Sequence, residues 1–513
     1  MIPRLYSQDA TAPEETTPKD NKILKLTLKE AVEQVLDNNL TIQNSKYEMI
    51  LADSALYKNE SKFAWKALAG IEVSKVKLPS NNNNVFSGTK QTQDKISIGI
   101  EKLFKTGTYF KAEASTMRFD TNAFESNLTP AAFQALAMPP LYTGSVGITL
   151  SQELLKYSFG KTEENRIKMM RKQAVIRREE LIFQLTNLVA KTLVDYWSLA
   201  VADSAVLTYE KLLKNTKQIR NLTYRKQRIG LAERFEANQW NALIFQIDGQ
   251  LQKQKNDREK ARRDLVRILN VNPSSQISGV TDLTEALPEK PNFEDEFTYA
   301  YSNRIDLLNI LRRKEVARLV LSNAKDEDMP SLTISGSYAS TGQNVFSPQS
   351  NYLNTQLGIP STKFPTMSAK IQLTYPLWDK GIKAGIRDAE LELKKLDEEE
   401  SKLKKEIQDE LRIRWLAIEN SHQILLDSKK TEQESEKYYK GIYRRFSQGS
   451  YQAVAVKNAL DSLLQSQLQT IQAKINFNIN LLRYDLAKNF LFTRFGIDIK
   501  EIIDKATKQA KKS

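Results

Sequence analysis

The sequence predicts a mainly helical protein with a β part, built from a structural unit that occurs twice. Two long runs with helical patterns and no proline, residues 161–228 and 380–447, are each followed by a glycine, Gly230 and Gly449. After each glycine a second helical run of about 40 residues returns along the first. Segments in which apolar and polar residues alternate precede each long run, and this alternation is typical of β-strands. The chain therefore shows twice the order helix, strands, long helix, turn and returning helix.

Composition excludes several kinds of protein. The chain has 513 residues, of which 40% are hydrophobic and 27% charged, and its mean hydropathy is −0.50. It has no run of about 18 apolar residues, so we expect no membrane-spanning helix. The nearest candidate, residues 185–207, is interrupted by Lys191, Asp195 and Asp203. The sequence contains no cysteine, which excludes disulfides, thiolate metal ligands and thiol catalysis.

The charged and reactive residues favour neither an enzyme nor a nucleic-acid-binding protein. His422 is the single histidine and lies in a charged helical run, so we expect it to be structural. No glycine-rich phosphate loop, metal-ligand cluster or nucleophile–base pair stands out. The net charge is +14, but basic residues are interleaved with acids, as in residues 390–414, which is typical of solvated helix faces. We predict no enzymatic activity, no cofactor, no metal and no nucleic-acid partner.

Both ends of the chain are predicted to lie outside the fold. Residues 1–25 are polar and contain prolines, which is typical of disorder. They lack the apolar core of a secretory signal, so we expect no signal peptide in them, or at most the remnant of a cleavage site. Residues 499–513 form a basic tail. Between the two ends we predict a first repeat at 26–270, a linker at 271–292 and a second repeat at 293–498.

Local signals place the elements within each repeat. Thr27 and Glu30 have the spacing of a capping box, at the start of a helix that we expect to continue to about Phe63. A matching helix at about 293–324 opens the second repeat. Strands are predicted at residues 68–78, 94–104, 107–119, 144–154, 331–340 and 367–377. The first repeat therefore carries an extra hairpin, residues 94–119.

The predicted strands carry apolar side chains on one face only. Ile96, Ile98 and Ile100, for example, alternate with Lys95 and Ser97. Strands that are apolar on one face and polar on the other, joined on one side by long polar loops, are typical of a membrane barrel. The alternative is the half-buried sheet of a soluble protein. The extra hairpin either adds two strands to this sheet, six in place of four in one chain, or folds outside it.

The duplicated order resembles the TolC family of outer-membrane efflux channels, from about Leu26 to Asp498. The resemblance rests on the order of the elements and on YPLWDKGIKAGIRDAELEL, residues 375–393, where a strand leads into the second long helix. It implies a homotrimer with a shared β-barrel in the outer membrane, continued by a long α-helical barrel in the periplasm. It also implies a periplasmic adaptor and an inner-membrane transporter as partners, in a tripartite efflux pump or a type I secretion system.

The resemblance further implies two functional regions. The glycine turns would form the periplasmic tip that receives the adaptor, through Ile229, Gly230, Leu231, Gln448, Gly449 and Ser450. The periplasmic aperture would be lined by Phe446, Tyr451, Ala455, Asn458 and Asp461. Because the positions of the family's carboxylates fall on Ala455 and Asn458, with Lys457 beside them, we expect a ring of Phe446 to close the aperture with little help from charge. The alternative for the two glycines is that they serve only to make the turns.

We therefore expect a passive export conduit of the outer membrane, with a barrel surrounded by outer-membrane lipid. The alternative is a soluble coiled-coil scaffold or interaction protein, which the helices alone would permit. Strands with one apolar and one polar face, joined by long polar loops, argue against the scaffold, because a coiled-coil scaffold consists of helices and does not require such strands. No motif indicates what is transported.

Overall fold

The computed structural model describes residues 24–52, 54–79, 88–125, 129–137, 139–230, 232–275, 277–279, 283–344 and 364–496. They belong to two compact units. The first comprises Met1–Leu51, Arg178–Leu308 and Ser401–Ser513, and the second Ala52–Arg177 and Asn309–Glu400. Most of the N-terminal segment that the sequence predicts to be disordered, and the whole basic tail, lie outside the described residues.

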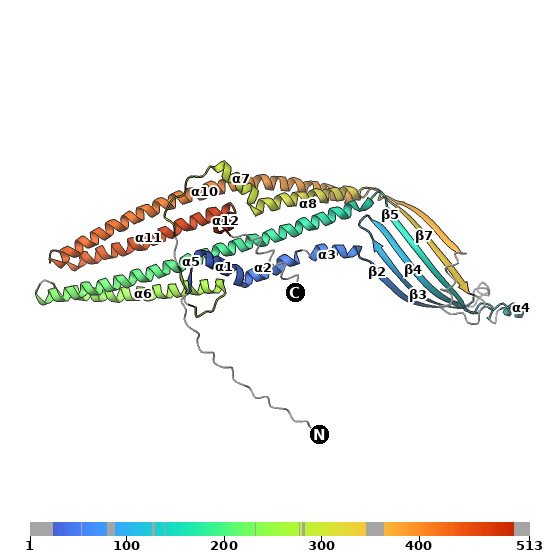
Figure 1. Cartoon of the computed structure of the whole chain (residues 1–513), viewed down its shortest axis with the longest axis horizontal. Helices are drawn as coiled ribbons and strands as arrows, with labels where there is room; N and C mark the ends of the chain where they lie inside the picture. Colours follow the sequence, from blue (N-terminus) through green and yellow to red (C-terminus); the bar gives the residue numbers. More distant parts are fainter. Residues whose placement is uncertain are drawn as a thin grey trace, which may run out of the picture. The chain divides into compact units, whose positions relative to one another are not determined.

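Helices make up most of the first unit (Figure 1). Two helices of 68 residues each, α5 (Lys161–Arg228) and α10 (Lys380–Ser447), have the bounds that the sequence predicts. Each is followed by a turn and a returning helix. The other elements of this unit are β1 (Leu24–Leu26), α1 (Leu28–Asn38), α2 (Leu40–Leu51), α6 (Arg234–Leu269), β6 (Ile277–Gly279), α7 (Phe293–Asn303), the start of α8 (Ile305–Glu327), α11 (Ala453–Ala487) and α12 (Leu491–Phe495).

The helix that opens each repeat is broken, which the sequence analysis did not foresee. Thr27 does cap α1, with the predicted capping box, but this helix ends at Asn38 and does not continue to Phe63. Asn39 has extended backbone (ψ 126°), and Arg304 has the same conformation between α7 and α8 (ψ 122°). Neither break contains a glycine or a proline. Asn39 is nevertheless a residue type that caps helices, and its Oδ1 accepts from the backbone N of Thr41 and of Ile42 at the start of α2 (2.8 and 3.3 Å).

The two breaks are held by matching hydrogen bonds. Asn39 Nδ2 donates to Ile268 O at the end of α6 (2.6 Å), and Arg304 Nη1 donates to Ala487 O at the end of α11 (2.9 Å). The interval from Ile268 to Ala487 is the same as that from Gly230 to Gly449.

A second matching pair of contacts lies beside the first. Asn270 and Asn489 have left-handed backbone, with φ of 52° and 60°. Asn270 Nδ2 donates to Asn38 O (3.0 Å), and Asn489 Nδ2 donates to Asn303 O (2.8 Å). Positive φ is uncommon outside glycine and is best tolerated by asparagine. Its occurrence at equivalent positions supports the predicted internal duplication, which stays a prediction.

Buried hydrophobic side chains of the first unit form three clusters. The largest gathers α1, α2, α5, α6 and the short parallel pair of β1 with β6. Tyr196 on α5 is fully buried there, and its hydroxyl donates to Leu26 O (2.7 Å). Strand β1 is a further correction to the sequence analysis, which assigned residues up to 25 to the disordered N-terminal segment.

The second unit is built on one antiparallel sheet of six strands, in the order β2-β3-β4-β5-β7-β8 (Figure 1). The bounds are β2 Lys66–Lys77, β3 Lys90–Leu103, β4 Thr108–Thr121, β5 Leu141–Glu153, β7 Ser331–Asn344 and β8 Pro365–Thr374. The extra hairpin forms β3 and β4, which lie between β2 and β5. The hairpin is therefore part of the sheet, and the alternative in which it folds outside the sheet is wrong.

Short helices and the ends of the long helices complete the second unit. They are α3 (Ser54–Glu60), the 3-10 turns Ser61–Phe63 and Ser158–Gly160, and α4 (Ala131–Gln134). Side chains join α5 to α8 here, because Thr162 Oγ1 donates to Asp326 Oδ2 (2.5 Å) and Asn165 Nδ2 donates to Asn323 Oδ1 (2.8 Å). Residues 80–87, 126–128 and 345–363, in three of the predicted loops, lie outside the described residues.

Candidate functional site

One face of the sheet is apolar across all six strands. Residues that pair across antiparallel strands point to the same face, so the register traces this face from β2 to β8. Ile71 pairs with Ile96, Ile148 with Tyr338, and Tyr338 with Met367. The same face carries Ala69, Ile98, Ala114, Val146, Gly336, Ala369 and Ile371.

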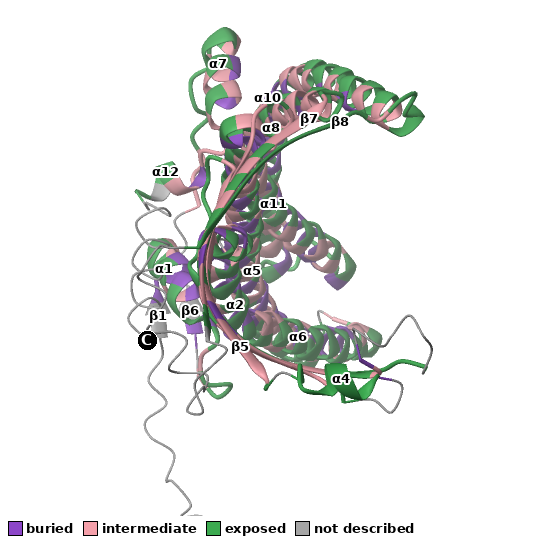
Figure 2. Ribbon diagram, turned by 90° about the vertical axis from the view of Figure 1, so that its right-hand side faces the viewer, coloured by how far each residue is buried: buried purple, intermediate pink, exposed green. Residues whose placement is uncertain are grey.

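This apolar face is open to solvent in the single chain. Ile71, Met367 and Ile371 are 78%, 73% and 71% exposed, and β8 is exposed along its whole length (Figure 2). Among the described residues, the three buried clusters contain no residue of the sheet. Soluble antiparallel sheets bury their apolar face on a core, and a continuous exposed apolar patch marks a surface for a partner or for lipid.

The sheet also has two free edges. Strands β2 and β8 stand at the two ends of the strand order, and each has one neighbour. Because every pairing between them is antiparallel, β2 and β8 run in opposite directions and have the polarity needed to pair with each other across two chains. Unpaired edges of this length are sites of strand addition unless they are covered.

Aromatic side chains gather at one end of the strands. Trp65, just before β2, contacts Phe104 and Phe110 edge to face, with ring centroids 6.4 and 5.9 Å apart. Lys102 Nζ lies 4.9 Å from the centroid of the Trp65 ring. Trp378, just after β8, is at the same end and is 86% exposed. A girdle of aromatic residues at the end of an apolar band is typical of the membrane interface.

The opposite face of the sheet is polar. Ser97, Ser115 and Ser145 follow one another across β3, β4 and β5. On β7 and β8 the hydroxyls of Ser337 and Ser368 share a hydrogen bond (2.7 Å). The sheet therefore separates an apolar surface from a polar one, as the alternation of the sequence predicts.

The two glycine turns join α5 to α6 and α10 to α11 in the first unit (Figure 1). Gly230 and Gly449 have φ of +74° and +91°, a region that other residues rarely adopt. Apart from the chain neighbours, no atom of the described residues lies within 4 Å of the place where a Cβ would stand on either glycine. The backbone conformation, and not crowding, is therefore what calls for glycine. Ile229 beside the first glycine is 69% exposed, whereas Leu231 lies outside the described residues.

The placement of Phe446 counts against its predicted role. Its side chain is 1% exposed and packs in the buried cluster of the two helical hairpins, beside Trp240 and Val456. Lys226 Nζ donates to Phe446 O and lies 4.0 Å from the centroid of its ring. A ring that closes an aperture has to face away from the core of its own chain, so Phe446 cannot do so in this conformation. Local sequence signals missed this because the partners of Phe446 come from α5, α6 and α11.

The other predicted aperture residues are more accessible. Tyr451 and Asn458 are exposed and Ala455 is half-buried. Asp461 accepts an ion pair from Lys457 one turn earlier (2.9 Å). Tyr451 lies on the turn after α10 and the other three lie on α11. Their role at an aperture stays a prediction.

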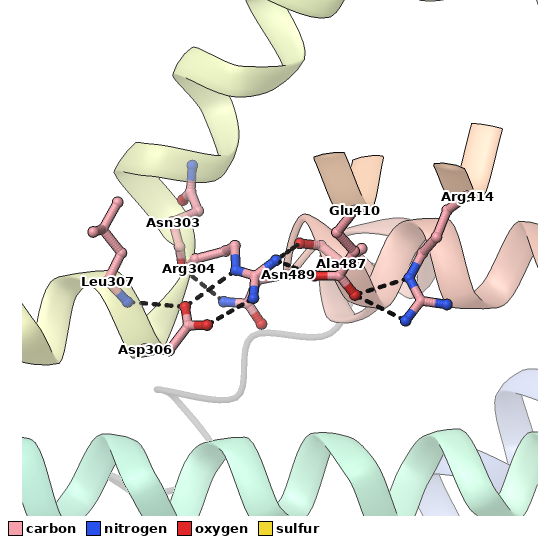
Figure 3. A network of polar contacts seen from close by, with 8 residues as sticks. All are labelled: Asn303, Arg304, Asp306, Leu307, Glu410, Arg414, Ala487 and Asn489. Atoms are coloured by element: carbon pink, nitrogen blue, oxygen red, sulfur yellow. Dashed lines mark hydrogen bonds and ion pairs between the residues drawn. The ribbon is translucent and has the colours of Figure 1, made fainter. Parts of the chain in front are cut away.

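A charged network that the sequence analysis missed surrounds the second helix break (Figure 3). Arg304 Nη1 donates to Glu410 Oε2 on α10 (2.7 Å), while its Nε and Nη2 donate to Asp306 (3.1 and 2.6 Å). Glu410 also accepts two hydrogen bonds from Arg414 (2.9 and 2.8 Å). Burial raises the pKa of Glu410, but the two arginines outweigh it and hold the pKa below its ordinary value.

The described residues offer no site for a metal and no transmembrane helix. No group of three or more histidine or acidic side chains among them is placed to hold a metal ion. No helix in the described part of the chain is both long and apolar enough to cross a lipid bilayer.

Comparison with solved structures identifies the fold. The outer-membrane channel OprN superposes with a TM-score of 0.64 at 14% identity, over 90% of this chain and 89% of that one. CusC superposes with a TM-score of 0.65 at 12% identity, over 94% and 98%. The CmeC outer-membrane channel of Campylobacter jejuni gives 0.62 at 14%, over 99% and 98%. The chain has the TolC-like fold.

These likenesses extend over nearly the whole chain, and at such low identity they show the fold alone. The mainly helical class with a β part is confirmed. No protein-family model matches the chain, and the comparison with curated proteins finds no match. The functional argument therefore rests on the surfaces described above.

Proposed function

We propose that this protein is an outer-membrane channel, a passive conduit that serves export through a tripartite efflux pump or a type I secretion system. The observation that carries the proposal is the uncovered apolar face of the six-stranded sheet. It lies opposite a polar face and is bordered by aromatic residues at one end. An apolar surface toward lipid and a polar surface toward a lumen are what a barrel wall in a bilayer requires.

One chain cannot close such a wall, so the channel is a homotrimer in this proposal. Six strands are too few to enclose a lumen that a transported molecule could pass. Strands β2 and β8 are free at the two edges and have opposite directions, so β8 of one chain can pair with β2 of the next. Three sheets joined in this way leave no unpaired edge, which is the usual reason for a closed barrel.

The two glycine turns are the proposed docking point for a periplasmic adaptor, beside an inner-membrane transporter. Ile229 and Val454 expose apolar side chains at these turns (69% and 47%). Exposed apolar residues beside turns that need a fixed backbone conformation suit the recognition of a helical hairpin tip. Tyr451, Ala455, Asn458 and Asp461 stay the proposed aperture residues, and Phe446 serves the core. Nothing in the proposal requires a reaction.

Neighbouring residues of β5 provide a sharp test of the membrane-facing surface. Ile148 lies on the apolar face and Thr149 on the polar face. Ile148→Arg should block insertion into the outer membrane, because arginine facing lipid at mid-depth costs about 2–4 kcal/mol. Thr149→Arg should leave insertion intact, since its side chain faces water. Membrane fractionation and the yield of detergent-extracted trimer measure both.

The same experiment contains the outcomes that contradict the proposal. Recovery of the unaltered chain as a soluble monomer would favour the coiled-coil scaffold. Equal insertion of the two arginine variants would show that the two faces of the sheet do not meet lipid and water. A purified trimer that forms no conducting pore in planar bilayers would contradict the proposed conduit function.

Docking at the turns is tested separately by site-specific photo-crosslinking. A photoreactive residue at Ile229 should crosslink to a periplasmic adaptor of the same host. The control is Phe245, which is 76% exposed on α6 but away from the turn. Crosslinks of equal strength at both positions, or at Phe245 alone, would overturn docking at the turn and leave the channel proposal standing.

A further inference from the structure

The charged side chains on the polar face of the sheet are concentrated on three neighbouring strands. The register places three lysines and three glutamates there, two on each strand: Lys66 and Glu72 on β2, Lys95 and Glu101 on β3, and Lys111 and Glu113 on β4. Four of these six belong to the hairpin β3–β4, which the second repeat lacks. The numbers of positive and negative charges are equal.

Five of the six charges form a ladder of ion pairs, and Glu72 stands opposite Lys95 in the register. Lys66 Nζ lies 3.5 Å from Glu101 Oε1, and Lys95 Nζ lies 3.7 Å from Glu113 Oε1. Lys111 forms a closer ion pair with the other oxygen of Glu113. Tyr109 Oη donates to Glu101 Oε2 (2.8 Å). Glu101 therefore holds one lysine and Glu113 holds two, all on the same face of the sheet.

Glycines flank Glu113 on both neighbouring strands. Gly99 on β3 and Gly147 on β5 are its direct partners in the register. A Cβ on Gly99 would stand 3.5 Å from the Cβ of Glu113 and 2.6 Å from Ala112 O, whereas one on Gly147 would stand 3.1 Å from the Cβ of Ala339 on β7. Without side chains at these two positions, the Glu113 carboxylate is reached by two lysines and stays open to the polar side of the sheet.

The other three strands contribute little charge to the polar face. Between Thr143 and Ser151 the polar face of β5 carries only serine, threonine and glycine, and that of β7 carries serine, threonine, alanine and glutamine. Glu153 lies at the end of β5, where Ser331 and Thr333 donate to it (3.0 and 2.5 Å). Lys370 is the one charged residue that β8 adds.

We propose that the ion pairs of the hairpin β3–β4 keep the channel lumen free of net charge and so make it weakly selective for charge. The inference rests on the proposed conduit and names the residues that set the charge of its lumen. Because Glu113 and Glu101 neutralise the lysines beside them, the lumen at this level has no net charge from the six side chains and admits small anions, small cations and zwitterionic solutes alike. A trimer repeats the ladder three times around the lumen, so each substitution changes the lumen charge by three.

Reversal potentials of the purified trimer in planar bilayers, across a tenfold gradient of potassium chloride, test the proposal. The unaltered channel should be weakly selective. Glu113→Gln frees Lys95 and Lys111 and should favour chloride over potassium by at least about threefold, because fixed charge in a lumen sets selectivity. Lys111→Met should shift the ratio in the opposite direction. Both shifts should shrink at high salt, where charges within a pore are screened.

Asp94→Asn is the matched control. Asp94 lies on β3 one residue before Lys95 and points to the apolar face, where it pairs with Arg118 (3.3 Å). Removing its charge should leave the reversal potential unchanged. A shift as large as that of Glu113→Gln would show that general charge, and not the ladder, sets the selectivity, and would overturn the inference.

Thiol labelling gives a second reading that does not depend on charge removal. The chain has no cysteine, so Ser97→Cys and Ile98→Cys each introduce a single thiol on opposite faces of β3. A positively charged methanethiosulfonate reagent should reduce the conductance of Ser97→Cys and leave that of Ile98→Cys unchanged. If the channels conduct but neither the ladder substitutions nor the label at Ser97→Cys changes their selectivity or conductance, the inference is wrong and the proposed conduit still stands. If the purified protein forms no conducting channel at all, the proposed function as a conduit is wrong.

Discussion

Replacing Arg304 with methionine tests how the second helix break is held. The arginine makes four hydrogen bonds, to Glu410, Ala487 O and Asp306, and its side chain is 15% exposed. Removing one partner of a fully buried ion pair costs about 3–5 kcal/mol. Glu410 and Asp306 are 32% and 39% exposed, so water can replace part of what they lose, and Glu410 keeps Arg414. We therefore expect a loss of about 2–3 kcal/mol.

Thermal unfolding of the detergent-solubilised protein, followed by circular dichroism at 222 nm, measures the effect. A loss of this size should lower Tm by about 2–3 °C for a protein of this length. The double variant Arg304→Met with Glu410→Gln should lose less than the sum of the single variants, because Glu410 is then no longer an unpaired charge. Arg263→Met, whose side chain is 70% exposed in its ion pair with Glu259, is the control and should change Tm little. If Arg304→Met stays within about 1 °C of the unaltered protein, the network does not hold the break.

Three further predictions concern other parts of the first unit. Gly230→Val should destabilise the turn by about 1–2 kcal/mol, whereas Gly230→Asn should cost much less, because the position needs positive φ and has room for a side chain. Thermal unfolding of the two variants shows whether the glycine is needed for the backbone conformation of the turn, independently of any partner that docks there. Burial raises the pKa of Asp485, and Arg494 offsets this only in part. The protonated carboxyl of Asp485 therefore contributes to stability below the ordinary pKa of aspartate, and this contribution is lost as the pH rises through the raised pKa. Asp485→Asn should therefore raise Tm at pH 7, and an equal gain at pH 3 would contradict this reasoning. Thr27→Ala removes one half of the capping box of α1 and should cost about 1 kcal/mol, seen as faster hydrogen exchange of the first amides of α1, with no change in α11.

The parts of the fold that depend on local chemistry could be predicted from the sequence. The bounds of α5 and α10 follow from long helical patterns that end beside a glycine, and the cap of α1 follows from Thr27 and Glu30. The strands follow from alternation, because a period of two puts all apolar side chains on one face. The register of the six-stranded sheet then needed the structure, since alternation alone does not say which strands are neighbours.

The parts that depend on distant partners could not be predicted. Asn39 breaks a helix because its amide reaches Ile268, and Arg304 does so because its guanidinium reaches Glu410 and Ala487. Asparagine is a common helix-capping residue, so Asn39 did offer a local signal for a helix start, whereas nothing beside Arg304 signals its distant partners. Phe446 has a similar explanation, because alignment with a family fixes its position along the chain but not whether its ring faces a lumen or a core. A shift of one residue on a helix changes the facing by about 100°.

The free edges of the sheet make the chain prone to aggregation before it assembles. Until β2 and β8 find their counterparts, each molecule presents two unpaired strands beside an uncovered apolar surface, which is the combination that leads to irregular aggregates. If the chain forms the proposed trimer, assembly competes with aggregation, and the balance depends on concentration because both outcomes require encounters between chains. Strong overproduction should favour the wrong encounters, and a holding chaperone that shields β2 or β8 should raise the yield of trimer without changing its stability once formed.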